Sequence, residues 1–212
     1  IKKVDKATSG KVGYIYIPDM GPEGLNEFSR YFYPQLDKEG LIIDDRANGG
    51  GNVSPMILER LSREPYRLTM RRGSSLIGTV PDAVQVGPKV CLINKYSASD
   101  GDLFPWGFRA LGLGKLIGTR TWGGIIGISG PLPYMDGTDI RVPFFTSYDP
   151  KTGNWIIENH GVDPDILIDN DPIKEWNGED QQLDRAIEEV MKQLKERKPL
   201  APVPAPRDWS HK

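Results

Sequence analysis

The chain has 212 residues, of which 38% are hydrophobic and 26% charged, and these proportions predict one globular domain and exclude a disordered chain. Its 27 Lys and Arg residues against 29 Asp and Glu residues give a net charge of −2, which argues against the basic surface of a nucleic-acid-binding protein. No apolar run approaches the roughly 18 residues of a membrane span. One cysteine, Cys91, and two histidines exclude an internal disulfide and a Cys/His zinc site.

The first half of the chain repeats a strand–loop–helix pattern three times. Short apolar runs that predict strands are each followed by a polar or glycine-rich loop and then by apolar residues at helical spacing. Pro105 is expected in the first turn of the third helix, where a missing N–H is tolerated. This order predicts an α/β fold with a largely parallel sheet. The predicted strands are 12–17, 41–43 and 89–93, and the predicted helices are 25–36, 56–61 and 103–111.

The second half is predicted to be β-rich and irregular, and it closes with an amphipathic helix. Short strands are predicted at 116–118, 122–124, 140–143 and 155–158. In the closing helix, Leu183 and Ile187 fall on the apolar face, whereas Glu188 and Glu189 fall on the polar face. Residues 198–212 form a proline-rich tail. Because the chain starts with Ile and lacks a signal sequence, we expect a fragment of a longer polypeptide.

Ser99 is a candidate nucleophile, because it lies where a buried strand gives way to a helix. The free N–H groups and positive end of a helix favour a developing anion there. The alternative interpretation is an N-cap, since Ser is a preferred capping residue. Glycines 49–51 follow the preceding strand and could bring backbone N–H groups close to a substrate. A plain tight turn is the alternative, and no Gly-Lys-Ser/Thr follows to make a P-loop.

Four further polar residues follow predicted strands. Glu158 ends one and could orient a catalytic group, or it could be a surface carboxylate. His160, two residues later, would face the same side, although a solvated turn histidine is the alternative. Asp44 and Asp45 end another strand and suggest acid/base or metal chemistry. We predict that they are not metal ligands, because adjacent strand residues face opposite ways and no further carboxylate has a coordinating spacing.

Six ordered blocks together carry a family resemblance that spans residues 11–194. The chain resembles the C-terminal catalytic domain of the tricorn proteases and their bacterial relatives. The resemblance implies a serine peptidase with a crotonase/ClpP-like α/β fold that acts on peptides or unfolded polypeptides, uses no cofactor and forms a homo-oligomer. The blocks are GYIYIPD (13–19), LNE (25–27), NGGG (48–51), SDGD (99–102), GLGKLIGTRTWGG (112–124) and ENHGVDPD (158–165).

The resemblance also implies roles for single residues. Ser99 would attack the peptide carbonyl, the backbone N–H groups of Gly51 and Asp100 would form the oxyanion hole, and Glu158 would be the carboxylate of the charge relay. The family's Ser-His pair precedes a PDZ-like domain upstream of Ile1, so the remainder of the polypeptide is an expected partner. Residues 65–73 lack the acidic residue that favours basic P1 side chains in the archaeal proteins. The predicted organisation is a linker at 1–10, a peptidase domain at 11–197 and a tail at 198–212.

Two other functions fit the same residues. One is a crotonase-like hydratase or thioesterase, in which glycine amides polarise the carbonyl of an acyl-CoA. The other is a non-catalytic peptide-binding module that keeps the cleft and lacks the base. Neither His160 nor His211 in the tail is a good partner for Ser99, so the isolated chain is expected to fold but to show little peptidase activity. The compartment, cytoplasmic or periplasmic, stays open, as does the P1 preference.

Overall fold

The fold is built on a five-stranded parallel sheet with the order β1-β2-β5-β6-β11. It is a computed structural model that describes residues 1–71, 73, 76–128, 132–198 and 203–204. The three strands predicted in the first half form neighbours in this sheet, which confirms the α/β prediction. The strands are β1 (Val12–Tyr16), β2 (Gly40–Asp44), β5 (Lys89–Ile93), β6 (Gly114–Gly118) and β11 (Ile166–Leu167).

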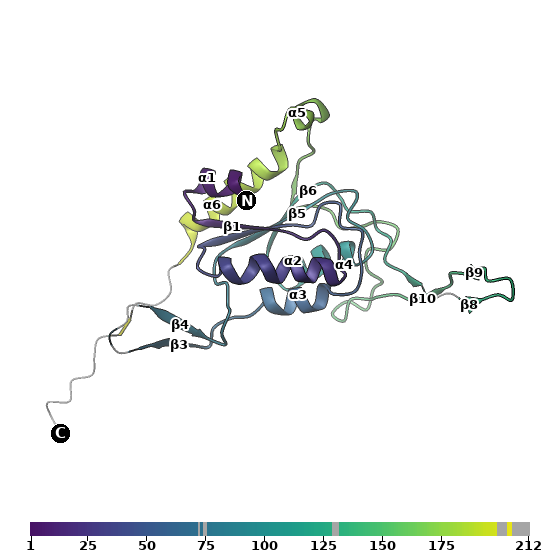
Figure 1. The fold of residues 1–212 in the computed structure, drawn as a ribbon, viewed down its shortest axis with the longest axis horizontal. Coiled ribbons are helices and arrows are strands. Elements are labelled where there is room, and N and C mark those ends of the chain that lie inside the picture. Colours follow the sequence, from purple (N-terminus) through teal and green to yellow (C-terminus); the bar gives the residue numbers. More distant parts are fainter. Residues whose placement is uncertain (72, 74–75, 129–131, 199–202, 205–212) are drawn as a thin grey trace, which may run out of the picture.

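Helices cover both faces of the sheet (Figure 1). Leu41 and Ile43 pack into the core on one face, whereas Ile42 packs into the core on the other. Because both faces are buried, the strands are continuous apolar runs. The first face is covered by α2 (Pro22–Phe32), α3 (Ser54–Leu61) and α4 (Asp100–Ala110), and the second by α1 (Lys2–Thr8) and α6 (Gln181–Glu196). A 3-10 turn, η1 (Tyr33–Gln35), follows α2, and the short helix α5 (Pro172–Trp176) precedes α6.

Three elements differ from the sequence prediction. Residues 1–10 were predicted to be a linker, but they include α1, whose Val4 is fully buried against the sheet and α6. Pro105 lies inside α4 instead of in its first turn, because the helix begins three residues earlier, at Asp100. Glu189 was placed on the polar face of α6 but is only 2% exposed, because Lys115 of β6 pairs with it at 2.8 Å.

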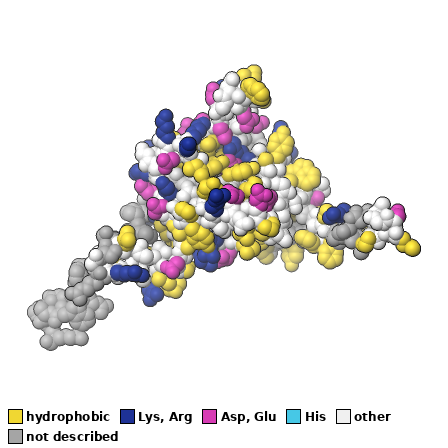
Figure 2. Space-filling model, viewed as in Figure 1, with side chains coloured by type: hydrophobic (Ala, Val, Ile, Leu, Met, Phe, Trp, Pro, Cys, Tyr) yellow, Lys and Arg dark blue, Asp and Glu magenta, His cyan; other side chains and the backbone are white. Residues whose placement is uncertain are grey.

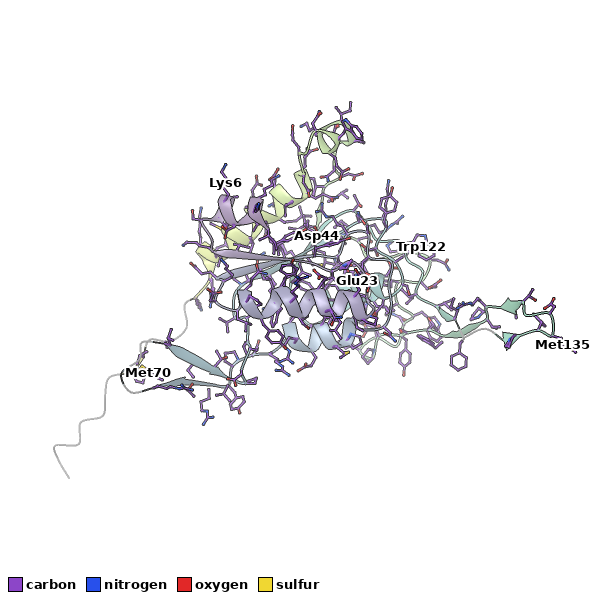
Figure 3. The ribbon with its side chains drawn as sticks, viewed as in Figure 1. Lys6, Glu23, Asp44, Met70, Trp122 and Met135 are labelled. Atoms are coloured by element: carbon purple, nitrogen blue, oxygen red, sulfur yellow. The ribbon has the colours of Figure 1, made fainter. Side chains whose placement is uncertain are left out.

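Small two-stranded sheets extend from the body towards opposite sides of the view (Figures 1 and 3). The first contains Met70, and the arm on the other side ends near Met135. Hydrophobic side chains lie exposed on the arm (Figure 2), among them Phe144. The first sheet pairs β3 (Arg67–Met70) with β4 (Ile77–Val80). The arm pairs β7 (Gly127–Ile128) with β10 (Pro143–Phe145) and β8 (Leu132–Pro133) with β9 (Asp139–Ile140).

The second half is β-rich as predicted, and the strand predicted at 116–118 lies within β6, but the other strands are placed differently. The strand predicted at 140–143 is divided between β9 and β10, and residues 122–124 have irregular backbone. In the predicted strand 155–158, Trp155 forms a bridge with Tyr148 and the backbone then turns. Most of the predicted tail, including His211, lies outside the described residues. In the part of the chain that the structure describes, no helix has the length and apolar character needed to cross a bilayer.

Candidate active site

The loops that follow β2 and β5 meet at the carboxyl edge of the sheet. Parallel strands that are neighbours place their following loops side by side, which is where α/β proteins bind ligands. The Ala98 N–H donates to the carbonyl of Asn48 at 2.8 Å, and the Ala47 N–H donates to Oδ1 of Asn94 at 2.9 Å. These contacts hold the glycine loop 47–51 against the turn that carries Ser99.

Ser99 occupies a strained turn at the start of α4. Its φ of 56° and ψ of −120° are unusual for a residue with a side chain, and such strain is concentrated at functional sites. Although Ser99 is the N-cap residue, its side chain caps nothing. Within the described residues its hydroxyl makes no hydrogen bond, and the residue is exposed. The capping alternative therefore does not explain this serine.

Gly50 lies directly against Ser99, and Gly51 lies directly against Met20. A Cβ on Gly50 would lie 2.6 Å from the Cβ of Ser99, and one on Gly51 would lie 2.0 Å from the carbonyl oxygen of Met20. Both glycines also have positive φ angles, of 100° and 150°. A side chain at Gly50 would push the loop away from Ser99, and one at Gly51 would push it away from Met20.

Within the described residues, the backbone N–H groups of Asp100 and Gly51 donate no hydrogen bond. Asp100 is the first residue of α4, so its N–H has no acceptor within the helix. The Met20 N–H donates to the carbonyl of Gly50 at 2.8 Å, and the Met20 carbonyl accepts from the Asn52 N–H at 2.7 Å. Gly51 lies between these two bonded residues, so its own N–H points away from Met20. The structure thus brings Ser99, Gly51 and Asp100 together. The carboxylate of Asp100 accepts from the N–H of Ser54 at 2.9 Å and from its hydroxyl, which joins α4 to α3.

Asp102 is a buried carboxylate in the first turn of α4 that was not among the residues predicted from the sequence. It is fully buried and accepts from the Gly123 N–H at 2.8 Å and from the Gly124 N–H at 3.3 Å. Burial raises its pKa, and the surrounding hydroxyl and N–H donors, including the N–H of Ser99, partly offset that rise. The signal that could have found it is the Ser-x-x-Asp spacing at a helix start, which resembles a capping box.

Glu158 lies in a half-buried turn, so the prediction that it ends a strand is wrong. The chain turns here because the carboxylate binds backbone of another segment: Oε2 accepts from the N–H groups of Ile125 at 2.7 Å and Ile126 at 3.0 Å. Within the described residues no hydrogen bond joins Glu158 to Ser99. The residue lines a cleft of about 550 Å³ with Ile126, Thr146, Trp155, Ile156, Ile157, Asn159 and His160.

His160 does not share partners with Glu158. Its Nε2 lies 2.7 Å from Oδ2 of Asp163, and both side chains are more than half exposed. The expectation that Glu158 and His160 act from one face of a strand is therefore wrong, because both lie in a turn. Within the described residues His160 makes no hydrogen bond to Ser99.

Asp44 and Asp45 serve opposite faces of the sheet, as their adjacent positions predict. Asp44 accepts from Tyr14 at 2.6 Å and pairs with Arg46, which also pairs with Asp180 at the start of α6 (Asp44 is labelled in Figure 3). Asp45 is fully buried, and neither carboxyl oxygen has a partner among the described residues. Burial, reinforced by nearby carboxylates, raises the pKa of Asp45 well above its usual range. The described residues contain no group of three or more His, Cys, Asp or Glu that could hold a metal ion.

Comparisons with known proteins identify the family. The model of Peptidase family S41 matches residues 11–168. The tricorn protease of Thermoplasma volcanium is 43% identical over 197 residues, which are 93% of this chain and 19% of that protein. Tricorn protease homolog 1 of Streptomyces coelicolor is 37% identical over 193 residues, 91% of this chain and 18% of that protein. The crystal structure of the tricorn protease superposes with a TM-score of 0.85 at 41% identity, covering 92% of this chain and 19% of that one.

A more distant structure shares the fold alone. Mature CPAF superposes with a TM-score of 0.61 at 17% identity, covering 90% of this chain and 53% of that one. The likeness to crotonase and ClpP stays a prediction. This chain spans about a fifth of the length of the tricorn proteases that it matches. The family match over residues 11–168 and the identity to tricorn proteases together show that the chain belongs to peptidase family S41.

Proposed function

We propose that this chain is the nucleophile-bearing part of a serine peptidase that hydrolyses peptide bonds in peptides or unfolded polypeptides. The observation that carries the proposal is the strained turn of Ser99, which lies against Gly50 and whose hydroxyl makes no hydrogen bond among the described residues. In this proposal the N–H groups of Gly51 and Asp100 form the oxyanion hole beside it. A nucleophile next to two convergent backbone donors is the arrangement that acyl transfer requires. The membership in peptidase family S41 supports the same reaction class.

In the proposed reaction, Ser99 Oγ forms a bond to the carbonyl carbon of the substrate while a general base takes the hydroxyl proton. The carbonyl oxygen becomes an oxyanion that accepts hydrogen bonds from the N–H groups of Gly51 and Asp100. Collapse of this intermediate breaks the C–N bond, and the amine leaves with the proton held by the base. Water then attacks the ester on Ser99, which releases the acid and restores the hydroxyl.

The base in this proposal comes from a Ser-His pair in the remainder of the polypeptide, with Glu158 as the carboxylate of the relay. His160 is a poor substitute, because its Nε2 is engaged by Asp163. In this proposal the described residues supply the nucleophile and the two donors, and the site is completed when the remainder of the chain, and other copies in a homo-oligomer, assemble around it. The reaction needs no metal or organic cofactor.

The test is hydrolysis of a panel of fluorogenic peptides by the full polypeptide that carries this chain. Ser99→Ala should lower kcat by at least about 10³-fold, because it removes the nucleophile and leaves the oxyanion donors. Ser62→Ala is the matched control, since its hydroxyl is exposed and bonds only to the carbonyl of Glu59 among the described residues. Full activity of Ser99→Ala would reject the proposal.

The same assay separates the two alternative functions. Peptide binding without hydrolysis, and without change in Ser99→Ala, would identify a binding module. Turnover of an acyl-CoA in place of peptides would identify a hydratase or thioesterase. Either result would contradict the peptidase proposal.

A further inference from the structure

Asp102 lies between the turn that carries Ser99 and the segment that binds Glu158. We propose that Asp102 is a positioning residue for the peptidase reaction, which holds the Ser99 turn in register with the segment that binds Glu158. This inference rests on the proposed function and adds a residue that makes no contact with the substrate. We name residues 121–126 the bridging segment.

On one side, the bridging segment is bonded to the turn that carries Ser99. The Trp122 N–H donates to the carbonyl of Ser97 at 2.9 Å. The next two N–H groups, of Gly123 and Gly124, donate to the two carboxylate oxygens of Asp102, at 2.8 and 3.3 Å. Asp102 is therefore the α4 side chain that receives this segment, three residues after the nucleophile.

On the other side, the bridging segment is bonded to the turn that carries Glu158. The carbonyl of Gly123 accepts from the Asn159 N–H at 2.7 Å, and the N–H groups of Ile125 and Ile126 donate to Glu158. Further along the same turn, the Val162 N–H donates to the hydroxyl of Thr121 at 2.8 Å. A chain of direct hydrogen bonds thus runs from α4 through the bridging segment to Glu158.

The bridging segment depends on side-chain acceptors because it belongs to no strand. Four of its N–H groups end on two carboxylates, Asp102 and Glu158. A carboxylate can accept from both glycine N–H groups at once, whereas an asparagine would turn its own N–H₂ group towards one of them. Asp102→Asn should therefore keep the volume of the side chain but release one end of the segment.

Asp102 is buried and contacts no cation among the described residues, so its hydrogen bonds stabilise its charge. The other acidic groups that face this region are Asp45 and Asp100, and neither supplies a positive charge to it. A small shift of the bridging segment moves Glu158 relative to Ser99. A displacement of about 1 Å at an active site can lower the rate by about 10²-fold.

The experiment compares kcat and KM of the full polypeptide with Asp102→Asn and Asp165→Asn. Asp165 is the matched control, because its carboxylate also accepts a hydrogen bond from a backbone N–H, that of Leu116 at 2.7 Å. Unlike Asp102, it lies towards the other end of α4, where it pairs with Arg109. We expect Asp102→Asn to lower kcat by at least about tenfold with KM changed less than about twofold, the pattern of a lost transition-state arrangement. Asp165→Asn should keep kcat within about twofold of the parent.

A kcat of Asp102→Asn within twofold of the parent, in a protein whose Ser99→Ala variant is inactive, would overturn this inference and leave the proposed function standing. An active Ser99→Ala variant would overturn both. If Asp102→Asn does not fold, residue-resolved hydrogen exchange of the parent protein decides. The inference is supported if the amides of Gly123 and Gly124 are protected from exchange as strongly as the amides of β5. It is contradicted if they exchange as fast as the amides of the exposed 150–153 turn.

Discussion

The two faces of the sheet stabilise their carboxylates in different ways at the same edge. On the α6 face, Arg46 lies between Asp44 and Asp180, and its guanidinium forms two hydrogen bonds to each. On the α2–α4 face, Asp102 is bonded to backbone N–H groups and Asp100 to a serine N–H and hydroxyl, whereas Asp45 has no partner among the described residues. One face therefore uses a cation, and the face that carries Ser99 uses neutral donors.

The difference shows how one residue type serves two purposes. The Arg46 cluster joins residues more than a hundred positions apart and fixes α6 to the sheet, which is a structural task. On the other face, neutral N–H and O–H groups hold the carboxylates close to the backbone around Ser99 and add no fixed positive charge. We therefore expect substitutions on the α6 face to lower mainly the stability of the protein. Substitutions on the face that carries Ser99 should lower mainly the rate of the reaction.

The largest expected effect on stability is that of Arg46→Met. It leaves Asp44, which is 2% exposed, without its cation, and breaking a buried pair from one side costs about 3–5 kcal/mol. Urea unfolding of the purified chain, followed by circular dichroism, measures the change. Arg63→Met is the control and should cost under about 1 kcal/mol, because its partner Glu59 is exposed. Equal losses in the two variants would refute the idea that Arg46 locks the α6 face.

Asp45→Asn should stabilise the protein, and the gain should grow as the pH rises. The pKa of Asp45 is raised in the folded state, chiefly by burial, and is about 3.9 in the unfolded chain. Above pH 4 the unfolded state loses this proton while the folded state keeps it, so folding becomes less favourable with rising pH. Asparagine does not titrate, and the gain should be about 1–3 kcal/mol near pH 8.

Unfolding measured between pH 4 and pH 8 tests this prediction. Asp44→Asn is the comparison, since it removes a carboxylate that Tyr14 and Arg46 hold, and it should destabilise the protein at pH 8. A difference between Asp45→Asn and the parent that does not vary with pH would contradict the buried, protonated state of Asp45.

The sequence predicts the central fold well for a physical reason. Strands such as β2 and β5 are buried on both faces, so their residues are continuous apolar runs that stand out from the loops. The Ser99 turn and the glycine loop are also found from sequence, because they follow these strands directly. What cannot be predicted is how irregular segments bond to one another. Glu158 was assigned to a strand because Trp155 and two isoleucines precede it, but its carboxylate binds distant backbone and the chain turns.

Long-range pairing accounts for the other differences. Glu189 has the helical position of a solvent-facing residue and is buried because Lys115 of β6 lies against it. The residues of α1 are mostly polar, and only the spacing of Val4 and Thr8 marks the buried side. In both cases the deciding partner is far along the sequence, where local patterns carry no information.

Glu189→Gln extends the comparison, because this carboxylate on the α6 face is also held by a cation. The hydrogen bond from Lys115, helped by Gln193 and Arg185, lowers the pKa of Glu189 to about 2. Because the unfolded value is about 4.3, the stabilisation is present above that pH and is lost as the pH falls towards 2. The variant should lose about 1–2 kcal/mol at pH 7 and match the parent near pH 2. A loss of equal size at both pH values would show that packing, and not charge, is responsible.

The smallest expected effect is that of His160→Ala on the exposed side of the candidate site. The pair of His160 with Asp163 is solvent-exposed, and such pairs contribute at most about 1 kcal/mol, so the unfolding free energy should change by less than that. In the full polypeptide kcat should stay within about twofold, because the proposed base lies in another part of the chain. Peptide hydrolysis and urea unfolding are measured on the same preparation, with Asp163→Asn as the control that frees the ring without removing it. A large loss of kcat in His160→Ala, with stability unchanged and Asp163→Asn active, would mean that the ring moves to Ser99 during turnover and that the base is internal.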